Sequence, residues 1–303
     1  MRLSRTVQAL LALALTACAA STRSANSLGD ANAAVAELLS VDRELGTSAS
    51  RMNVVDALSR AFADDIVLLS RGRVFTGRDS AIASLRAIPE NLSARLTWAP
   101  LRGGISADAR HGFTYGFMTM TRPDSTRTQL KYLAYWIRGA GNWKVAVYKR
   151  APRPDGVVST RELAPMVPER LVAATSDSSI VRRHAAELDA AERAFSDLAK
   201  TIGLGPAFTR NAAPDAMNMG GPQDTSFVFG PEAIGRGVGG ESTAPSTISW
   251  GPERVLVASS GDLGVTIGYI VSPGTGTNAP ARTPFFTVWR RATPSQPWRF
   301  VAE

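Results

Sequence analysis

Two stretches of the chain place apolar residues at the three- and four-residue spacing of a helix that buries one face. The first stretch is Leu38, Val41 and Leu45, and the second is Leu188, Ala191, Phe195 and Leu198. Side chains at these intervals share one side of an α-helix. The pattern predicts one long amphipathic helix in each half of the chain.

A shorter helix is expected after each long one. Residues 52–62 fit a helix, whereas the equivalent segment 203–208 contains two glycines and a proline, which disfavour helical structure. We therefore expect the second segment to be distorted. Further short helices are expected after Gly77 and Gly230, each leading back towards strand-forming sequence.

The later part of each half is rich in residues that favour strands. Strands are predicted over residues 113–120 and 265–270, and two hairpins over residues 132–148 and 285–302. Helices first and antiparallel strands afterwards indicate an α+β fold rather than a parallel α/β sheet.

These patterns recur because the sequence itself recurs. Leu96–Pro100 returns as Ile248–Pro252, and Gly112–Phe117 returns as Gly264–Tyr269, both 152 residues later. The period is far longer than the roughly 20–50 residues of stacked repeats, so it indicates a duplicated domain. The predicted segments are 1–17 for a signal peptide, 18–32 for a flexible tether, 33–152 for the first domain, 153–180 for a linker and 181–303 for the second domain.

The first residues are organised like a secretion signal. Arg2 and Arg5 precede an apolar run over residues 7–15. This run is shorter than the about 20 apolar residues that a membrane span needs. Leu15–Cys18 resembles the bacterial lipobox, which implies lipidation of Cys18 and a membrane-anchored lipoprotein of the bacterial cell envelope.

Two alternatives remain for this end of the chain. Ordinary secretion, with Ala17-Cys18-Ala19 as an A-x-A-like cleavage site, is one reading of the same small residues. If Cys18 is lipidated, the resemblance implies that Ala19 directs the protein to the outer membrane, on its periplasmic face.

Charge and cysteine content narrow the possible functions. The formal net charge is +8, but the basic residues, 30 arginines among 34, are dispersed without a long run. Nucleic-acid binding normally needs a clustered basic patch, so no nucleic-acid partner is predicted. Cys18 is the single cysteine and there are only two histidines, which argues against disulfides and thiolate metal sites. We expect neither a metal nor a cofactor.

Several motifs together resemble the nuclear transport factor 2-like (NTF2-like) superfamily, which includes SnoaL-like and ketosteroid-isomerase-like domains. The motifs are Ala63–Asp65 before an apolar strand, the Val74–Asp79 turn, Gly261–Gly268 and the closing hairpins with their tryptophans. The resemblance covers both copies. It implies two tandem cones, each a curved antiparallel sheet wrapped around N-terminal helices, with an apolar pocket inside. Members include isomerases, hydrolases and non-enzymatic binding modules, so the fold does not determine the function.

The catalytic candidates are few. Ketosteroid isomerases use a carboxylate base on the strand after the helices, but residues 66–70 and 216–220 contain no acid. Asp65 lies at the helix-to-strand junction, where turn and capping roles are common. Asp42-Arg43 and Glu192-Arg193 could form buried catalytic pairs, or could lie in solvent or tie the helix to the sheet. His111 is a further candidate general base, although we can place no partner beside it.

The aromatic residues on the predicted strands are the candidates for ligand binding. They are Trp98, Tyr115, Tyr132, Tyr135, Trp250 and Tyr269. Aromatic strand residues often serve only the core, whereas in a ligand site they line an apolar cavity. The tyrosines concentrate in the first copy, so we expect the ligand there. A G-x-G-x-x-G motif at Gly235–Gly240 lacks the strand before it that nucleotide binding requires.

The sequence thus favours an envelope lipoprotein with two NTF2-like domains, acting as a non-catalytic binding module for an apolar small molecule or a protein partner. The alternative is a SnoaL-like lyase, isomerase or hydrolase that uses Asp42 or Asp65 with Tyr115. The resemblance further implies an intramolecular pseudo-dimer, since relatives commonly dimerise through their sheets.

Overall fold

The chain contains two units of the same topology. The structure, a computed structural model, describes residues 14–139, 141–274 and 279–303, with side chains from Ala31 onward. The strand order is β2-β1-β6-β5-β4-β3 in the first sheet and β8-β7-β12-β11-β10-β9 in the second. The two orders correspond strand for strand. The predicted α+β class and two cone-shaped units are confirmed.

The first unit begins with helices and ends with long strands. Its elements are α1 (Ala14–Ala49), α2 (Val54–Ala61), β1 (Phe62–Ser70), β2 (Arg73–Thr76), α3 (Arg78–Arg86), the 3₁₀ helix η1 (Pro89–Leu92), β3 (Arg95–Ile105), β4 (His111–Thr121), β5 (Arg127–Arg138) and β6 (Trp143–Pro152). Helix α2 is capped at its N-terminus by Asn53, whose side chain accepts a hydrogen bond from the Asp56 amide.

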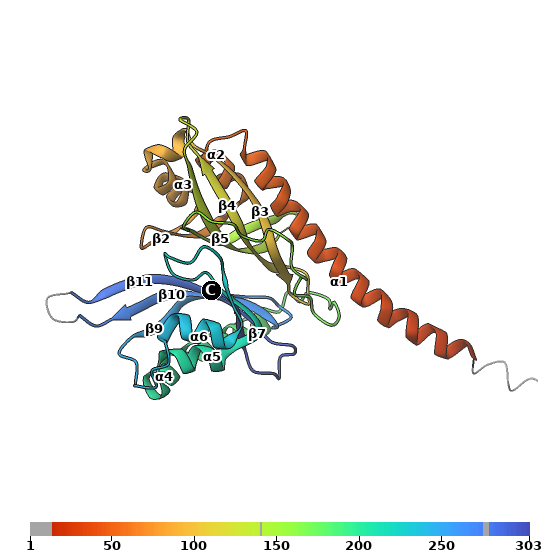
Figure 1. The fold of residues 1–303 in the computed structure, drawn as a ribbon. Helices are drawn as coiled ribbons and strands as arrows, with labels where there is room; N and C mark the ends of the chain where they lie inside the picture. Colours follow the sequence, from red (N-terminus) through yellow and green to blue (C-terminus); the bar gives the residue numbers. More distant parts are fainter. Residues whose placement is uncertain (1–13, 140, 275–278) are drawn as a thin grey trace, which may run out of the picture.

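The second unit repeats this order. Its elements are α4 (Ser178–Ile202), α5 (Leu204–Asn211), β7 (Ala212–Asn218), β8 (Val228–Phe229), α6 (Pro231–Gly239), β9 (Ser249–Val257), β10 (Leu263–Ser272), β11 (Ala281–Arg290) and β12 (Arg299–Ala302). Figure 1 shows the two sheets facing each other, with the helices of each unit on the outer side.

Two expectations about the strands and helices differ from the structure. The sheets are mixed rather than purely antiparallel, because β1 pairs in parallel with β6 and β7 with β12. Helix α5 is regular despite its glycine and proline. Pro206 lies in its first turn, where the missing amide needs no helical partner. Gly205 lets the backbones of α5 and α6 approach, since a Cβ there would lie 2.9 Å from the Gly235 carbonyl oxygen.

At the N-terminus, helix α1 begins at Ala14 and includes the segment 18–32 expected as a flexible tether. Alanines are frequent in this segment and favour helix. Helix α1 extends beyond the sheet that it covers (Figure 1). Of the predicted signal peptide, residues 1–13 lie outside the described residues, and Cys18 lies where side chains are not described. No helix in the described part of the chain is long and apolar enough to cross a membrane.

Paired glycines explain how each sheet bends around its helix. On β4 and β10, a Cβ at Gly112 or Gly264 would lie 2.5 Å from a leucine side chain of the long helix. A Cβ at Gly116 or Gly268 would lie about 2 Å from a carbonyl oxygen of the neighbouring strand, where the ladder register shifts. Bulges of this kind increase sheet curvature. The repeated Gly-x-x-x-Gly is therefore a packing requirement.

The outer faces of the two sheets pack on each other. Tyr115 of β4 is fully buried, and its ring lies 5.2 Å from that of Phe227 in the loop before β8. Lys131 of β5 is also buried and donates to the carbonyl oxygens of Asp224 and Ser226 in the same loop. The segment 219–227 of the second unit thus closes over the first sheet.

The β3–β4 and β9–β10 turns meet beside this apolar contact. The Asp108 carboxylate accepts hydrogen bonds from the Ser259 hydroxyl and the Ser260 amide, while the Ala107 amide donates to Asp262. The linker then runs along the edge of β3, where Leu163 and Met166 exchange backbone hydrogen bonds with that strand.

We expect Phe227→Ala to lower the unfolding free energy by about 3 kcal/mol, since it removes a buried ring from the contact between the sheets. Val157→Ala is the control: that side chain is fully exposed, and its loss should change the unfolding free energy by less than about 1 kcal/mol. Urea denaturation measures both. Equal effects would mean that the loop does not hold the sheets together.

Candidate functional site

Each cone buries one carboxylate from its long helix. In the first cone Asp42 of α1 is 2% exposed and accepts hydrogen bonds from the Trp98 indole at 2.8 Å and the Tyr132 hydroxyl at 2.7 Å. The donors come from β3 and β5. The carboxylate therefore ties the helix to the inner face of the sheet.

In the second cone Glu192 of α4 takes the same position. It is fully buried, and one oxygen accepts from the Trp250 indole at 2.6 Å. The other oxygen accepts from the Thr266 hydroxyl at 2.5 Å and from the Trp289 indole at 2.9 Å. The neighbouring arginines point away: Arg43 pairs with Glu162, and Arg193 with Asp189. Asp42 therefore forms no buried ion pair with Arg43, and Glu192 forms none with Arg193.

Burial dominates the electrostatics of both carboxylates. It raises the pKa of Asp42 and of Glu192 above the ordinary values, against the lowering effect of their hydrogen-bond donors. No salt bridge connects either group to a cation in the described part of the chain. Both cones thus contain an acid that is easier to protonate than one in water.

The ladder registers identify equivalent positions inside the two cones. Tyr132 lies opposite Gly116, and Phe285 lies opposite the equivalent Gly268. Phe62 pairs with Val145, as Ala212 pairs with Phe300. By the same registers, Tyr148 at the end of the first cone is replaced by Glu303 in the second.

These exchanges leave the two interiors with different free volumes. Phe62, Tyr132 and Tyr148 fill the first cone, where about 10 Å³ remains beside Asp42. The second cone holds a cavity of about 260 Å³. We expected the ligand in the first copy, but the larger of these two interior cavities lies in the second. The tyrosines were misleading because Tyr132 fills the first cone, whereas Tyr115 and Tyr135 lie on the outer face of its sheet.

The cavity wall is mainly apolar. Its aromatic members are Phe195, Phe208, Trp250 and Phe285. Its aliphatic members are Leu204, Val238, Ile248 and Ile270. The polar members are Glu192, Thr287 and Glu303. An apolar enclosure with a few polar groups is the usual form of a small-molecule site.

The aromatic candidates divide between three environments. Trp98 and Tyr132 point into the filled first cone, and Trp250 lines the cavity. Tyr115 and Tyr135 lie on the outer face of the first sheet, in the core shared with the second unit. Tyr269 is partly exposed, with the Arg282 guanidinium 3.5 Å from its ring centre.

The remaining acid–base candidates lie away from the cavity. Asp65 is exposed and forms an ion pair with Arg254 of the second unit at 2.8 Å. His111 contacts the Tyr135 hydroxyl at 2.8 Å through Nδ1. Burial lowers the pKa of His111 to about 4, although the negative charge of Asp108 opposes this. His111 is therefore neutral near pH 7.

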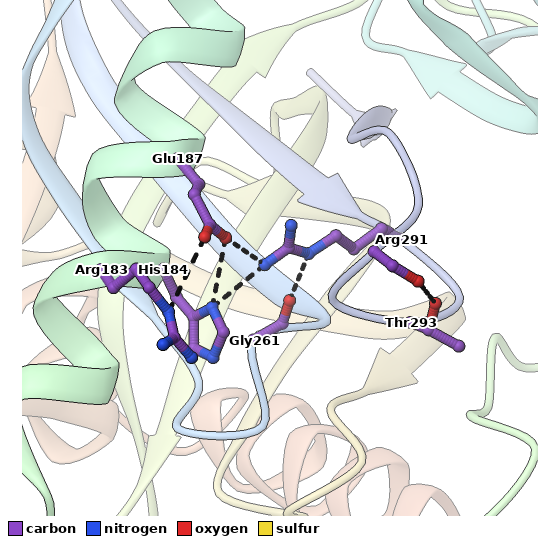
Figure 2. A network of polar contacts seen from close by, with 7 residues as sticks. Arg183, His184, Glu187, Gly261, Arg291 and Thr293 are labelled. Carbon is purple, nitrogen blue, oxygen red and sulfur yellow. Dashed lines mark hydrogen bonds and ion pairs between the residues drawn. The ribbon is translucent and has the colours of Figure 1, made fainter.

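Figure 2 shows a second polar network, which joins α4, the β9–β10 turn and the end of β11. The buried Arg291 donates to the Gly261 carbonyl oxygen and to Glu187 of α4, and contacts His184 Nδ1 at 3.1 Å. Its guanidinium lies over the Trp298 ring. Arg138 makes the equivalent contacts in the first unit, pairing with Glu37 of α1 and lying over Trp143. Because it is repeated beside a filled cone, we assign this network to holding helix and hairpin together.

Of the residues that make the site, the sequence pattern indicated Trp250 as a ligand contact and Glu192 only as the neighbour of Arg193. Glu192 follows Leu188 by four residues and precedes Phe195 by three, so it shares the apolar face of its helix. An acid at such a position is a signal that could have been used. Phe208 and Glu303 had no comparable signal, since their common location depends on how α5 and β12 meet. Among the described residues, no group of three or more His, Cys, Asp or Glu side chains is placed to hold a metal ion.

No family model matches this chain, and no curated protein matches it. Parts of it are similar to solved structures at low identity. One, from Xanthomonas campestris, is described as a calcium/calmodulin dependent protein kinase II association domain. It is 14% identical, covers 40% of this chain and 88% of its own, and has a TM-score of 0.33.

Two further solved structures are described as NTF2-like proteins of unknown function. The one from Shewanella oneidensis is 14% identical and covers 35% of this chain and 88% of its own, with a TM-score of 0.29. The one from Pseudomonas putida is 16% identical and covers 44% of this chain and 94% of its own, with a TM-score of 0.32. The assignment of the fold rests on the strand order of this chain.

The raised pKa of Glu192 makes the stability depend on pH in a defined direction. Between its unfolded and folded pKa values, the folded protein binds more protons than the unfolded chain. The contribution of Glu192 is therefore fully present below the unfolded pKa and is lost as pH rises through the folded pKa. We expect the unfolding free energy of Glu192→Gln, measured by urea denaturation from pH 4 to 8, to fall less with rising pH than that of the unsubstituted protein. Parallel curves would mean that Glu192 does not titrate differently on folding.

Proposed function

We propose that this protein is an envelope lipoprotein built from two NTF2-like domains, and that its second domain binds a small apolar molecule without transforming it. The domain bounds are those indicated by the repeat, 33–152 and 181–303. The supporting observation for the binding role is the cavity of about 260 Å³ in the second cone, at a position that large side chains fill in the first. In this arrangement the second copy, whose interior is open, binds the ligand, and the first copy, whose interior is filled, has a structural role.

A small molecule accounts for the cavity better than a protein partner does. The walls are concave and mostly aromatic or aliphatic, as in small-molecule sites. A protein partner would instead favour a contiguous apolar surface patch. The large apolar side chains exposed among the described residues, such as Leu92, Val157 and Phe229, come from separate segments.

The geometry favours binding over catalysis. Asp42 lies in the filled cone, Asp65 is exposed and His111 lies between the units. Glu192 faces the cavity region, but its oxygens already accept three hydrogen bonds. A general base must take up a proton, and these donors favour the charged carboxylate instead.

A SnoaL-like lyase, isomerase or hydrolase is the second candidate. The observation in its favour is that Glu192 is an acid of raised pKa beside an apolar cavity, a combination found in catalytic acids. In that case the acid would be Glu192 rather than Asp42 or Asp65 with Tyr115.

The anchor and the first domain complete the proposal. Lipidation of Cys18 places the protein on the periplasmic face of the outer membrane, and helix α1 carries the first domain away from the bilayer. Sheet-to-sheet packing within one chain then takes the place of the dimer contact of relatives, as a pseudo-dimer. The apolar contact around Tyr115 and Phe227 supports this arrangement.

Native mass spectrometry of the chain purified from its own host tests the binding role. We expect a retained small molecule that is lost in Val238→Trp, because the larger side chain enters the cavity from α6. Val271→Trp is the matched control, since Val271 is exposed and does not line the cavity. A molecule retained equally by both variants would contradict the site. A substrate added in excess and recovered chemically altered would favour the enzyme.

The anchor has a test of its own. We expect Cys18→Ser to move the protein from the membrane fraction to the soluble fraction, and to abolish incorporation of a labelled fatty acid. An unchanged distribution between the two fractions would contradict lipidation at this residue and would favour ordinary secretion.

A further inference from the structure

The polar groups of the second cone's cavity are unbalanced in charge. Its described lining residues include two carboxylic acids, Glu192 and Glu303, but no lysine, arginine or histidine. The one other polar member is the Thr287 hydroxyl. A charge inside an apolar enclosure is felt strongly, because little water is present to screen it. The site thus favours a positively charged group over a neutral or negative one.

The filled first cone shows what the second one lacks. There the Tyr132 hydroxyl donates to Asp42 from the interior of the cone, at 2.7 Å. At the equivalent position the second cone has Phe285, whose ring cannot donate a hydrogen bond. The open space beside Phe285 therefore lies where the first cone supplies its own donor. Glu192 accepts hydrogen bonds from Trp250, Thr266 and Trp289, and a carboxylate has about four acceptor sites, so one donor from a ligand can still take that place.

The second acid is also specific to this cone. Glu303 replaces Tyr148, whose ring packs against Phe62 in the first cone with 6.1 Å between ring centres. The exchange removes an aromatic side chain that fills space and adds a carboxylate to the wall. Burial raises the pKa of Glu303 to about 8, and a ligand cation beside it would favour its charged form.

The cations near these acids do not enter the cavity. Arg193 is held on the outer side of α4 by Asp189 and by the Pro252 carbonyl oxygen. Lys149 belongs to the other sheet. Its ammonium group contacts the Phe286 carbonyl oxygen at 3.4 Å and lies over the Phe286 ring, on the outer face of β11. Lys149 acts on Glu303 through the sheet and leaves Glu192 without a cation.

The aromatic walls suit the same class of ligand. The rings of Phe195 and Trp250 meet edge to face with 4.8 Å between centres, and Phe208 lies at 4.8 Å from Phe195. An organic cation is attracted to the face of an aromatic ring, because the ring face carries partial negative charge. The cavity is smaller than the roughly 300–1,000 Å³ common for ligand sites, so it fits a small molecule.

We infer that the second cone takes a small apolar amine, with its ammonium group directed to the Glu192 side of the cavity and its apolar body against the aromatic wall. This inference rests on the proposed binding function and specifies its ligand class. The ligand's N–H groups replace the donor that Tyr132 provides in the first cone.

Calorimetric titration with three matched probes tests the inference on the full chain at pH 7. The probes are 2-phenylethylamine, 2-phenylethanol and phenylacetate, which share one apolar body and differ in charge. We expect the amine to bind about tenfold more tightly than the alcohol, a difference of about 1.4 kcal/mol, and the anion to bind most weakly. Val238→Trp should abolish the binding of each probe.

Variants separate charge from shape. Phe285→Tyr gives the second cone the hydroxyl of Tyr132, and should remove most of the preference for the amine over the alcohol. Glu303→Gln should reduce the preference and leaves the hydrogen bonds of Glu192 intact. Asp197→Asn is the matched control. It removes one negative charge from an exposed site on α4, the helix of Glu192, and should leave the preference for the amine unchanged. Thermal melting checks that each variant is folded.

The outcomes are distinct. If the alcohol or the anion binds as tightly as the amine, the ligand class is wrong while the proposed binding function stands. If none of the three probes binds at millimolar concentration, the proposed function fails together with the inference. If the amine is preferred equally by the unsubstituted protein and by Phe285→Tyr, the preference does not arise at Glu192.

Discussion

A buried hydrogen bond from an indole to a carboxylate organises both halves of this molecule. Trp98 donates to Asp42 in the first cone, and Trp250 donates to Glu192 in the second. A hydrogen bond to a charged group contributes about 1.5–3 kcal/mol, and a carboxylate left unpaired in the interior would be more costly still. The long helix can therefore take only one position against the sheet. The glycines of β4 and β10 allow it to approach closely enough for the bond to form.

That constraint also decides where free space can exist. With the helix held by its carboxylate, the interior volume depends on the few side chains that project from the sheet and the second helix. Phe62, Tyr132 and Tyr148 fill the first cone, whereas Ala212, Phe285 and Glu303 leave the second open. The same framework thus yields a solid core in one unit and a cavity in the other. Because the framework bond is common to both, the difference is a matter of side-chain size and polarity.

The contact between the two sheets follows from the curvature of each sheet around its own helices. A sheet that wraps around its own helices has an outer face that must be covered, and each unit covers the other. Tyr115 and Tyr135, which resemble pocket residues in sequence, are used for this contact. The buried Lys131 shows that the contact is specific, since its ammonium group is bonded to two carbonyl oxygens of the second unit.

The sequence by itself determined the class and order of the elements. The spacing of Leu38, Val41 and Leu45, the strand-forming runs and the repeat are local properties that need no partner to be visible. Only the tertiary structure decided which cone is open and which side chains of each strand point into its cone. Tyr132 and Tyr135 are three residues apart on one strand and point to opposite faces. Whether an inward ring fills a space or lines it depends on residues brought from β1, β6 and α2. The free volume inside a cone depends on side chains from segments that are distant in the sequence, so no local sequence pattern predicts it.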